Sequence, residues 1–202
     1  MLGRLGLKLV TATLWRTTVA GAEYVPRSGG VLIAANHISL ADGVPVLVGA
    51  PRRVAFLVNR TAWRLPWLGA LLSAMRGIPV KLDSMDHTAL RAAESALTAG
   101  EAVLVFPEGH LNPGDGLLPL KPGAAWLALR ARVPVVPAFV WGTRAILPYG
   151  ARKPQFAPAR IGVRFGPPLA LDSAPVSLSP EAIGAVNARL LAAISALAGE
   201  RR

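Results

Sequence analysis

Short apolar runs alternate with segments of helical periodicity along most of this chain. Six runs have the length and the content of Val, Ile, Leu and Ala that are typical of buried strands. They span residues 31–35, 54–58, 78–82, 103–106, 133–140 and 161–165. Pro134 and Pro137 place the start of the fifth run at a sheet edge or at an irregular position, because proline cannot donate a ladder hydrogen bond.

The segments between these runs have the spacing of helices. Residues 83–99 form the clearest one, because Asp86 can cap its start and Gly100 can end it. Its apolar face comprises Leu90, Ala93 and Leu97. Residues 122–130 also predict a helix, with proline in its first turn, whereas the apolar residues 65–75 predict a helix or a hairpin.

Two further amphipathic segments lie at the ends of the chain. Residues 1–22 predict an N-terminal helix in which basic residues recur at near-helical spacing and Trp15 can anchor at a membrane interface. This helix is expected either at such an interface or packed on the core of the protein. A final helix starts at Ser179, and its apolar face comprises Ile183, Val186, Leu190, Ile194 and Leu197.

Strands that alternate with helices predict a single α/β domain over residues 1–202, with a largely parallel central sheet flanked by helices. In such sheets, functional groups collect beyond the carboxyl ends of the strands. His37 follows one predicted strand and Glu108 follows another, so we expect these two side chains at the same edge of the sheet.

The amino-acid composition favours a protein that functions at a membrane surface. Hydrophobic residues make up 52% of the chain and charged residues only 16%. No uninterrupted apolar run approaches the roughly 18 residues of a membrane span. We therefore expect either a large core or a protein at the cytoplasmic face of a membrane, bound peripherally or monotopically. The absence of cysteine excludes disulfides, thiolate catalysis and cysteine metal sites.

The net charge of +11 is unevenly distributed. Between Asp115 and Asp172 the chain has no acidic residue, and its basic residues there are Lys121, Arg130, Arg132, Arg144, Arg152, Lys153, Arg160 and Arg164. This basic stretch predicts a solvated face or a positive surface that attracts anionic lipid, phosphate or an acidic partner protein. Nucleic acid is not expected as a partner, because aromatic residues do not interleave with the basic ones and no nucleic-acid-binding motif occurs.

The strongest chemical signal is the segment Asn36-His37-Ile38-Ser39-Leu40-Ala41-Asp42, directly after the first predicted strand. A histidine beside a carboxylate can act as a general base at working pH, with the carboxylate orienting it. Positions five apart on an α-helix are separated by about 500°, so the two side chains would not share a helix face. They can meet only if the histidine lies on a strand-to-helix turn and the aspartate in the first turn of the helix. In that arrangement, the N–H groups of residues 38–41 could stabilise an oxyanion.

A second signal, Phe106-Pro107-Glu108-Gly109, also follows a predicted strand. A carboxylate next to glycine suits close approach of a polar ligand.

Two further blocks complete an ordered set over residues 30–145. One runs from Arg60 through Leu65-Pro66-Trp67-Leu68-Gly69 to Gly77-Ile78-Pro79-Val80, and the other is Val133-Pro134-Val135-Val136-Pro137 followed by Gly142-Thr143. With these four blocks, the chain resembles the glycerolipid acyltransferase family, most of all the 1-acylglycerol-3-phosphate acyltransferases.

The resemblance implies transfer of a fatty acyl group to the free hydroxyl of 1-acylglycerol-3-phosphate, which gives phosphatidic acid in phospholipid biosynthesis. His37 then matches the general base, and Asp42 matches the carboxylate that orients it. Asn36, Glu108 and Gly109 match positions expected beside the acceptor. The implied co-substrate is acyl-CoA or acyl-acyl carrier protein, a thioester that is already activated, so no cofactor or metal is expected. The basic stretch would help an acidic carrier protein to dock.

Two positions depart from the family pattern, because Leu82 and Leu111 stand where the family often has arginines that bind the acceptor phosphate. Arg60, Lys81 and Lys121 are expected to bind the phosphate instead, since lysine is an adequate point-charge partner for it. Alternatively, the acceptor is another lysolipid or a hydroxylated lipid that lacks a phosphate monoester. A non-catalytic lipid-binding protein is a further alternative, which an intact base–carboxylate pair disfavours.

Overall fold

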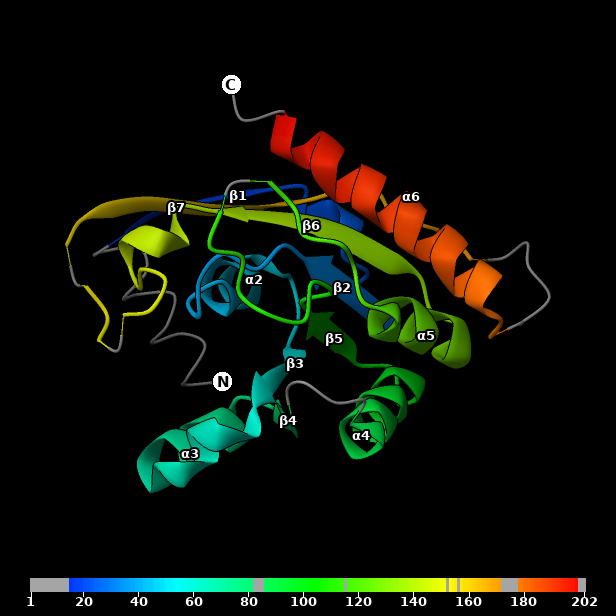
Figure 1. The fold of residues 1–202 in the computed structure, drawn as a ribbon, viewed down its shortest axis with the longest axis horizontal. Helices are drawn as coiled ribbons and strands as arrows, with labels where there is room; N and C mark the ends of the chain where they lie inside the picture. The colour runs from blue at the N-terminus through cyan, green and yellow to red at the C-terminus, as the bar shows by residue number, and fades with distance from the viewer. Residues whose placement is uncertain are drawn as a thin grey trace.

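The fold is built on one seven-stranded sheet with the strand order β1-β7-β6-β2-β5-β3-β4 (Figure 1). The computed structural model describes residues 15–81, 86–114, 116–151, 153–155, 157–171 and 178–199. The strands are β1 (Trp15–Ala20), β2 (Val31–Ala35), β3 (Val54–Asn59), β4 (Gly77–Val80), β5 (Ala102–Val105), β6 (Val135–Trp141) and β7 (Ala159–Phe165). Neighbouring strands pair in parallel except β6 and β7, which are antiparallel. The predicted α/β fold with a largely parallel sheet is confirmed.

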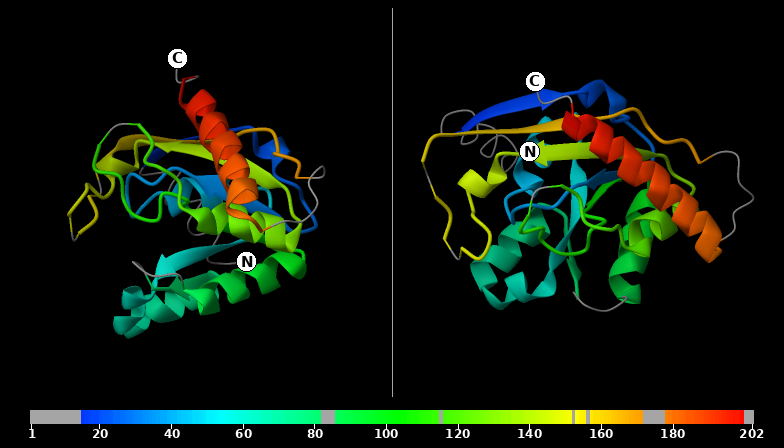
Figure 2. Two further views of the ribbon diagram at one scale, coloured as in Figure 1. Left: turned by 45° about the vertical axis from the view of Figure 1, so that its right-hand side comes forward. Right: turned by 45° about the horizontal axis from the view of Figure 1, so that its top comes forward.

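Helices cover both faces of this sheet (Figures 1 and 2). The helices are α2 (Gly43–Gly49), α3 (Pro66–Ala74), α4 (His87–Thr98), α5 (Pro122–Ala131) and α6 (Pro180–Gly199), with 3-10 helices η1 (Ala22–Tyr24), η2 (Arg60–Arg64) and η3 (Thr143–Ala145) in the connections. α2 and α3 pack on the face that Val31 and Ile33 of β2 present. α4, α5 and α6 pack on the face that Leu32 and Ala34 present. Because both faces are covered, β2 is apolar throughout and fully buried.

α4 starts and ends where its capping residues predict. Asp86 accepts hydrogen bonds from the N–H groups of Thr88 and Ala89, each at 3.1 Å. Gly100 has a φ of +83°, in the left-handed region that glycine adopts most readily after a helix. Residues 65–75, predicted as a helix or a hairpin, contain the helix α3. Residues 82–85 lie outside the described residues.

The predicted N-terminal helix is wrong for residues 15–22. Residues 15–20 form β1, which pairs in parallel with β7, and η1 follows. Trp15 is buried in a small apolar cluster and not at an interface. The chain has three consecutive β-branched residues in β1, and the edge of β7 supplies hydrogen-bonding groups for them, so sheet pairing overrides the helical spacing. Residues 1–14, the rest of the predicted interface helix, lie outside the described residues.

β6 lies inside the sheet, between β7 and β2, so the first of the two positions predicted for the start of this strand, a sheet edge, is excluded. Its start is irregular, as predicted, because pairing with β7 begins only at Ala138 while Val135 bridges to Leu169. Pro137 stands just beyond the ladder with β7, where its carbonyl accepts from the N–H of Gly166 at 2.8 Å. Because proline has no N–H, Pro137 donates no hydrogen bond in return.

α6 is the one described helix that is long and apolar enough to span a membrane by length and composition. One of its faces is buried, however, through Val186, Leu190, Ile194 and Leu197. These residues pack against the apolar side chains of α5 and the sheet. The apolar face predicted for the final helix is therefore a core face.

Candidate active site

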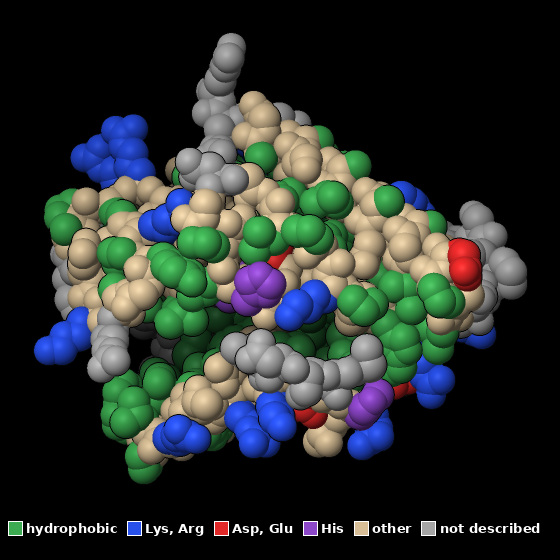
Figure 3. All heavy atoms as spheres, viewed as in Figure 1, with side chains coloured by type: hydrophobic (Ala, Val, Ile, Leu, Met, Phe, Trp, Pro, Cys, Tyr) green, Lys and Arg blue, Asp and Glu red, His purple; other side chains and the backbone are tan. Residues whose placement is uncertain are grey.

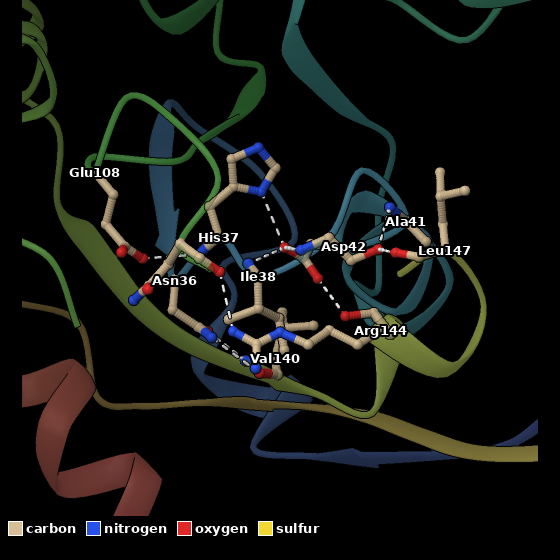
Figure 4. Close-up of polar contacts among 12 residues, drawn as sticks. Asn36, His37, Ile38, Ala41, Asp42, Glu108, Val140, Arg144 and Leu147 are labelled. Carbon is tan, nitrogen blue, oxygen red and sulfur yellow. Dashed lines mark hydrogen bonds and ion pairs between the residues drawn. The ribbon is translucent and has the colours of Figure 1, made fainter. Parts of the chain in front are cut away.

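The carboxyl ends of β2 and β5 bring the two predicted signals together (Figure 4). His37 lies in the turn after β2, and Asp42 is the N-cap residue of α2. Nδ1 of His37 and Oδ2 of Asp42 are 2.9 Å apart. Glu108, which follows β5, accepts a hydrogen bond from the N–H of His37 at 2.7 Å. The predicted turn is confirmed, with Asp42 one residue before the helix and not within its first turn.

Asp42 is fully buried, and donors hold both of its carboxylate oxygens. Oδ2 also accepts from the N–H groups of Ile38 at 2.6 Å and Ser39 at 2.8 Å. Oδ1 accepts from the hydroxyl of Thr143. Because each of these groups donates, the carboxylate is an acceptor only, and Nδ1 of His37 carries a hydrogen. In the neutral imidazole, Nε2 then keeps its lone pair, and Figure 4 shows this second ring nitrogen pointing away from Asp42.

Most N–H groups of residues 38–41 are used within this turn, so the expectation that they stabilise an oxyanion is wrong for three of them. Ile38 and Ser39 donate to Asp42, and Ala41 donates to the hydroxyl of Ser39 at 3.1 Å. The turn therefore uses its amides to hold the carboxylate in place. Within the described part of the chain, the N–H of Leu40 alone among the four has no acceptor.

Glu108 is fully buried and holds two separate backbone segments. Oε1 accepts from the N–H of His37, and Oε2 accepts from the N–H of Leu118 at 3.0 Å. The carboxylate thereby fixes the backbone of His37 relative to the loop of residues 106–121. In this geometry, Glu108 influences the candidate base by holding the backbone of His37 in place.

The same loop is tied to His37 by a second route. The N–H of Asn112 donates to the carbonyl of His37 at 2.7 Å. The guanidinium group of Arg144 donates to the carbonyls of Asn112 and Gly114. Arg144 belongs to the basic stretch that was predicted to form a surface, but its guanidinium group instead stabilises this loop.

Two more cations of the basic stretch have partners within the fold. Arg130 forms an ion pair with Glu94 at 2.9 Å. Arg164 donates to the carbonyl of Leu197 at 3.2 Å, near the end of α6, where the helix dipole favours a cation. These contacts stabilise the fold, so the basic stretch is not one uniform ligand-binding surface.

Asn36 ties the end of β2 to β6. Its Oδ1 accepts from the N–H of Val140 at 2.6 Å, and its Nδ2 donates to the carbonyl of Val140 at 3.0 Å. The side chain is buried, and both ends of its amide are paired in this way. Asn36 therefore sets the position from which the turn with His37 starts.

The sequence pattern alone did not single out Phe106 and Thr143, which contact the candidate base and its carboxylate. Phe106 stacks on the imidazole of His37, with ring centroids 4.0 Å apart and an angle of 12° between the planes. Thr143 is fully buried at the start of η3 and donates its hydroxyl to Asp42. Both residues belong to blocks that carry the family resemblance, and that membership was the available signal.

Gly109 and Lys121 lie against each other beside Glu108. Gly109 has a φ of +74°, and a Cβ at this position would stand 2.5 Å from Cδ of Lys121. The positive φ favours glycine at this position, and the stem of the lysine lies directly over it. The N–H of Lys121 donates to the carbonyl of Pro107 at 2.7 Å, which closes the loop. The ammonium group of Lys121 is thus held next to the residue that follows Glu108.

Arg60 and Lys81 lie at the same edge of the sheet but farther from His37. They directly follow the paired residues Asn59 and Val80, and both are exposed. β5 separates β2 from β3, so a strand spacing of about 4.8 Å places Arg60 about 10 Å and Lys81 about 14 Å along the sheet from the strand before His37. Leu111 is half-buried, and Leu82 lies outside the described residues.

The backbone around Lys81 is fixed by Asp86. Its Oδ2 accepts from the N–H of Lys81 at 2.8 Å. Backbone hydrogen bonds from Lys81, Ala89 and Thr88, together with the nearby charge of Arg60, hold the pKa of Asp86 below its ordinary value.

A groove of about 390 Å³ lies at the opposite edge of the sheet. Arg76 and Glu101, which precede β4 and β5, form an ion pair in its wall. This position separates the groove from His37. Among the described residues, no group of three or more His, Cys, Asp or Glu side chains is placed to hold a metal ion.

Known proteins are similar to this chain in sequence and in fold. The acyltransferase family model matches residues 16–141. The 1-acyl-sn-glycerol-3-phosphate acyltransferase of Bacillus subtilis is 27% identical over 137 residues, which cover 67% of this chain and 68% of that protein. The human 1-acyl-sn-glycerol-3-phosphate acyltransferase alpha is 28% identical over 181 residues, which cover 87% of this chain but only 61% of the human protein. The crystal structure of the 1-acyl-sn-glycerophosphate acyltransferase from Thermotoga maritima has the same fold, with a TM-score of 0.76 and 23% identity over 98% of this chain and 81% of that chain.

Proposed function

The chain belongs to the acyltransferase family, and from this premise we propose that it transfers a fatty acyl group to the free hydroxyl of 1-acylglycerol-3-phosphate. The donor is acyl-CoA or acyl-acyl carrier protein, and the product is phosphatidic acid. The names of the Bacillus subtilis and human relatives support this acceptor. The observation that carries the proposal is the contact of 2.9 Å between His37 and the buried Asp42, which leaves Nε2 directed away from the carboxylate.

In this reaction, His37 acts as the general base. Nε2 takes the proton of the acceptor hydroxyl while the hydroxyl oxygen attacks the thioester carbonyl, a contribution of about 10²–10⁴-fold to the rate. When the tetrahedral intermediate collapses, the C–S bond breaks and the imidazolium returns the proton to the leaving thiolate. Because a thioester is already activated, the reaction needs no covalent enzyme intermediate.

Asp42 keeps the imidazole in the tautomer and the orientation that this proton transfer needs. Its carboxylate is held by Ile38, Ser39 and Thr143, so it cannot turn away from the ring. The positive charge that develops on His37 also lies beside a buried carboxylate, where attraction between charges is stronger than in water.

Of the three cations expected at the acceptor phosphate, Lys121 is the best placed. The phosphate and the reacting hydroxyl of 1-acylglycerol-3-phosphate are on neighbouring carbons, so the phosphate must bind close to Nε2 of His37. Lys121 lies over Gly109, next to the residue that holds the backbone of His37. Arg60, about 10 Å along the sheet, ranks second, and Lys81, about 14 Å along it, ranks third.

The reaction takes place at the cytoplasmic face of a membrane, where the acceptor resides, and the protein binds there peripherally or monotopically. The high hydrophobic content of 52% and the net charge of +11 support this location. Exposed members of the basic stretch, such as Lys153 and Arg160, would attract an acidic carrier protein.

The test is acyl transfer by the purified protein, supplied with mixed lysolipids and either acyl-CoA or acyl-acyl carrier protein. Mass spectrometry of the products should show mainly phosphatidic acid. His37→Ala should reduce turnover by about 10²-fold or more and leave the fold intact. His110→Ala is the matched control, because this exposed histidine lies in the neighbouring loop and should keep full activity.

Two outcomes would contradict the proposal. Substantial acyl transfer by His37→Ala would exclude this histidine as the general base. Preferential acylation of acceptors that lack a phosphate monoester would favour the alternative lipid acceptor, for which Leu82 and Leu111 in place of expected arginines are the supporting observation.

A further inference from the structure

α3 carries an apolar stripe that faces solvent. Its positions i, i+3, i+4 and i+7 from Trp67 are all exposed, and together with Leu65 they form what we call the α3 surface: Leu65, Trp67, Ala70, Leu71 and Ala74. Trp67 is 68% exposed, Leu65 51% and Leu71 48%. The opposite side of α3 is apolar as well, because Leu72 packs on the core. A helix that is apolar on all sides normally lies inside a core or against a membrane.

Trp63 of η2 holds α3 in this orientation. Its indole ring lies so close to Gly69 that a Cβ there would stand 2.8 Å from Cδ1 of Trp63. The Nε1–H of Trp63 donates to the hydroxyl of Ser73 at 3.1 Å. η2 and α3 thus pack as one unit, and this packing directs the α3 surface outward.

The surroundings of the α3 surface are positively charged. Residues 60–81, from the start of η2 to the residue after β4, contain four basic residues and no acidic one. Arg60, Arg64 and Lys81 among them are exposed. Figure 3 shows Lys and Arg side chains beside the hydrophobic side chains that gather over α3. An exposed apolar stripe bordered by cations complements a bilayer with anionic head groups.

The α3 surface also borders the candidate active site. η2 starts at the carboxyl end of β3, the edge of the sheet where His37 and Glu108 lie, and α3 follows directly. Leu40, in the turn between His37 and Asp42, is 66% exposed at the same edge. Figure 3 shows this side of the molecule hollowed between α3 and the loop that follows β5. A lipid that leaves a bilayer at α3 would therefore have a short path to the candidate base.

We infer that the α3 surface is the membrane-docking surface of this protein and that its occupant is a bilayer containing anionic lipid. Leu65, Trp67 and Leu71 insert at the level of the head groups, and Arg64 contacts the anionic ones. The inference rests on the proposed function, because it explains how a water-insoluble acceptor reaches His37. Binding to vesicles without substrate tests it separately from turnover.

The first experiment measures partition of the protein onto phosphatidylcholine vesicles with and without phosphatidylglycerol. The double variant Trp67→Ala, Leu71→Ala should weaken partition about tenfold or more, since it removes most of the apolar area of the α3 surface. Tyr24→Ala is the matched control, because this aromatic residue is 39% exposed at the opposite edge of the sheet. Unchanged partition of the double variant would overturn the inference.

The second experiment tests the charged border of the α3 surface. Arg64→Gln should weaken binding to vesicles with phosphatidylglycerol about fivefold and leave binding to pure phosphatidylcholine unchanged. High salt should remove the difference between the variant and the parent protein, because it screens exposed charges. An equal effect of Arg64→Gln on both kinds of vesicle would contradict a role in contacting anionic lipid.

A third measurement keeps the inference testable even if the double variant fails to fold. Brominated phosphatidylcholine should quench the tryptophan fluorescence of the parent protein, and the conservative Trp67→Phe should lose a large part of that quenching. Quenching that persists in full in Trp67→Phe would show that another part of the molecule meets the bilayer. Loss of self-association in the double variant, with unchanged partition, would identify a second copy of the chain as the occupant.

Failure of the docking surface and failure of the proposed function are distinguishable. With a short-chain, water-soluble lysolipid, the double variant should transfer acyl groups as fast as the parent protein, since α3 then has no role in delivery. Vesicle binding through α3 by a protein without acyl transfer would refute the enzyme activity alone. Acyl transfer by the parent protein, together with unchanged vesicle binding of the double variant, would refute the docking surface alone.

Discussion

The ring of Phe106 stacks on the imidazole of His37, with centroids 4.0 Å apart and an angle of 12° between the ring planes. Phe106 follows β5 and His37 follows the neighbouring strand β2, so the contact joins the ends of two paired strands. Asp42 fixes one nitrogen of the imidazole, and the stacked ring restricts rotation about that contact. Together, the two contacts determine the direction of Nε2.

Phe106→Leu should lower kcat about two- to tenfold, because it removes a stacked contact worth about 0.5–1.5 kcal/mol while it keeps an apolar side chain. KM should change little, since the substitution affects the orientation of the base and not the binding of substrate. Steady-state kinetics with the proposed substrates would measure both values. Phe106→Tyr should retain the activity, and a change confined to KM would contradict the orienting role.

Thr143→Val should destabilise the protein by about 1–3 kcal/mol and reduce kcat as well, because it leaves Oδ1 of the buried Asp42 without its hydroxyl donor. Urea unfolding and kinetics would measure the two effects. Thr143→Ser keeps the hydroxyl and should restore kcat. If Ser and Val reduce kcat equally, the hydroxyl is not what orients the carboxylate.

Glu108→Gln should destabilise the protein by about 1–3 kcal/mol, because one of the two backbone N–H groups would then face an amide N–H₂ in a fully buried position. Turnover should fall with it, since Glu108 holds the backbone of His37. Urea unfolding compared with that of Glu101→Gln, a partly exposed carboxylate at the other edge of the sheet, would measure the effect. A Glu108→Gln protein of full stability with only a raised KM would instead indicate direct contact with the acceptor.

Lys121→Met should raise KM for 1-acylglycerol-3-phosphate about tenfold, because it keeps the apolar stem over Gly109 and removes the charge beside the site. Lys81→Met is the matched control and should have a smaller effect, because Lys81 lies farther along the sheet. Kinetics with an acceptor that lacks the phosphate should show no effect of either substitution. A larger effect of Lys81→Met would reverse the proposed order of the cations.

Asp86→Ala should destabilise the protein by about 1 kcal/mol at neutral pH, because it removes the N-cap of α4. Since backbone hydrogen bonds lower the pKa of Asp86 in the folded state, its stabilising effect is complete above the pKa of the unfolded chain. It is lost as the pH falls through the lowered folded-state value. Urea unfolding from neutral to acidic pH should therefore show the difference from the parent protein shrinking in acid, whereas a constant difference would argue against the ionised carboxylate as the cap.

Local rules were sufficient for the elements whose signals lie within a few residues. The capping of α4 by Asp86 and the pair of His37 and Asp42 both follow from short spacing along the backbone. The largely parallel sheet also follows, because strands that alternate with helices have few other ways to bury their apolar faces. β1 was predicted wrongly, because its residues have helical spacing. They form a strand only because the edge of β7 is available for pairing.

The sequence by itself determined the α/β class, most elements and the pairing of the candidate base with its carboxylate. Only the tertiary structure decided what Glu108 and Thr143 do, because their partners His37 and Asp42 lie 71 and 101 residues away along the chain. It also decided that Trp67 faces outward, since that depends on how Trp63 packs against α3. Periodicity shows which positions share a face, but the packing of distant segments sets what each face meets.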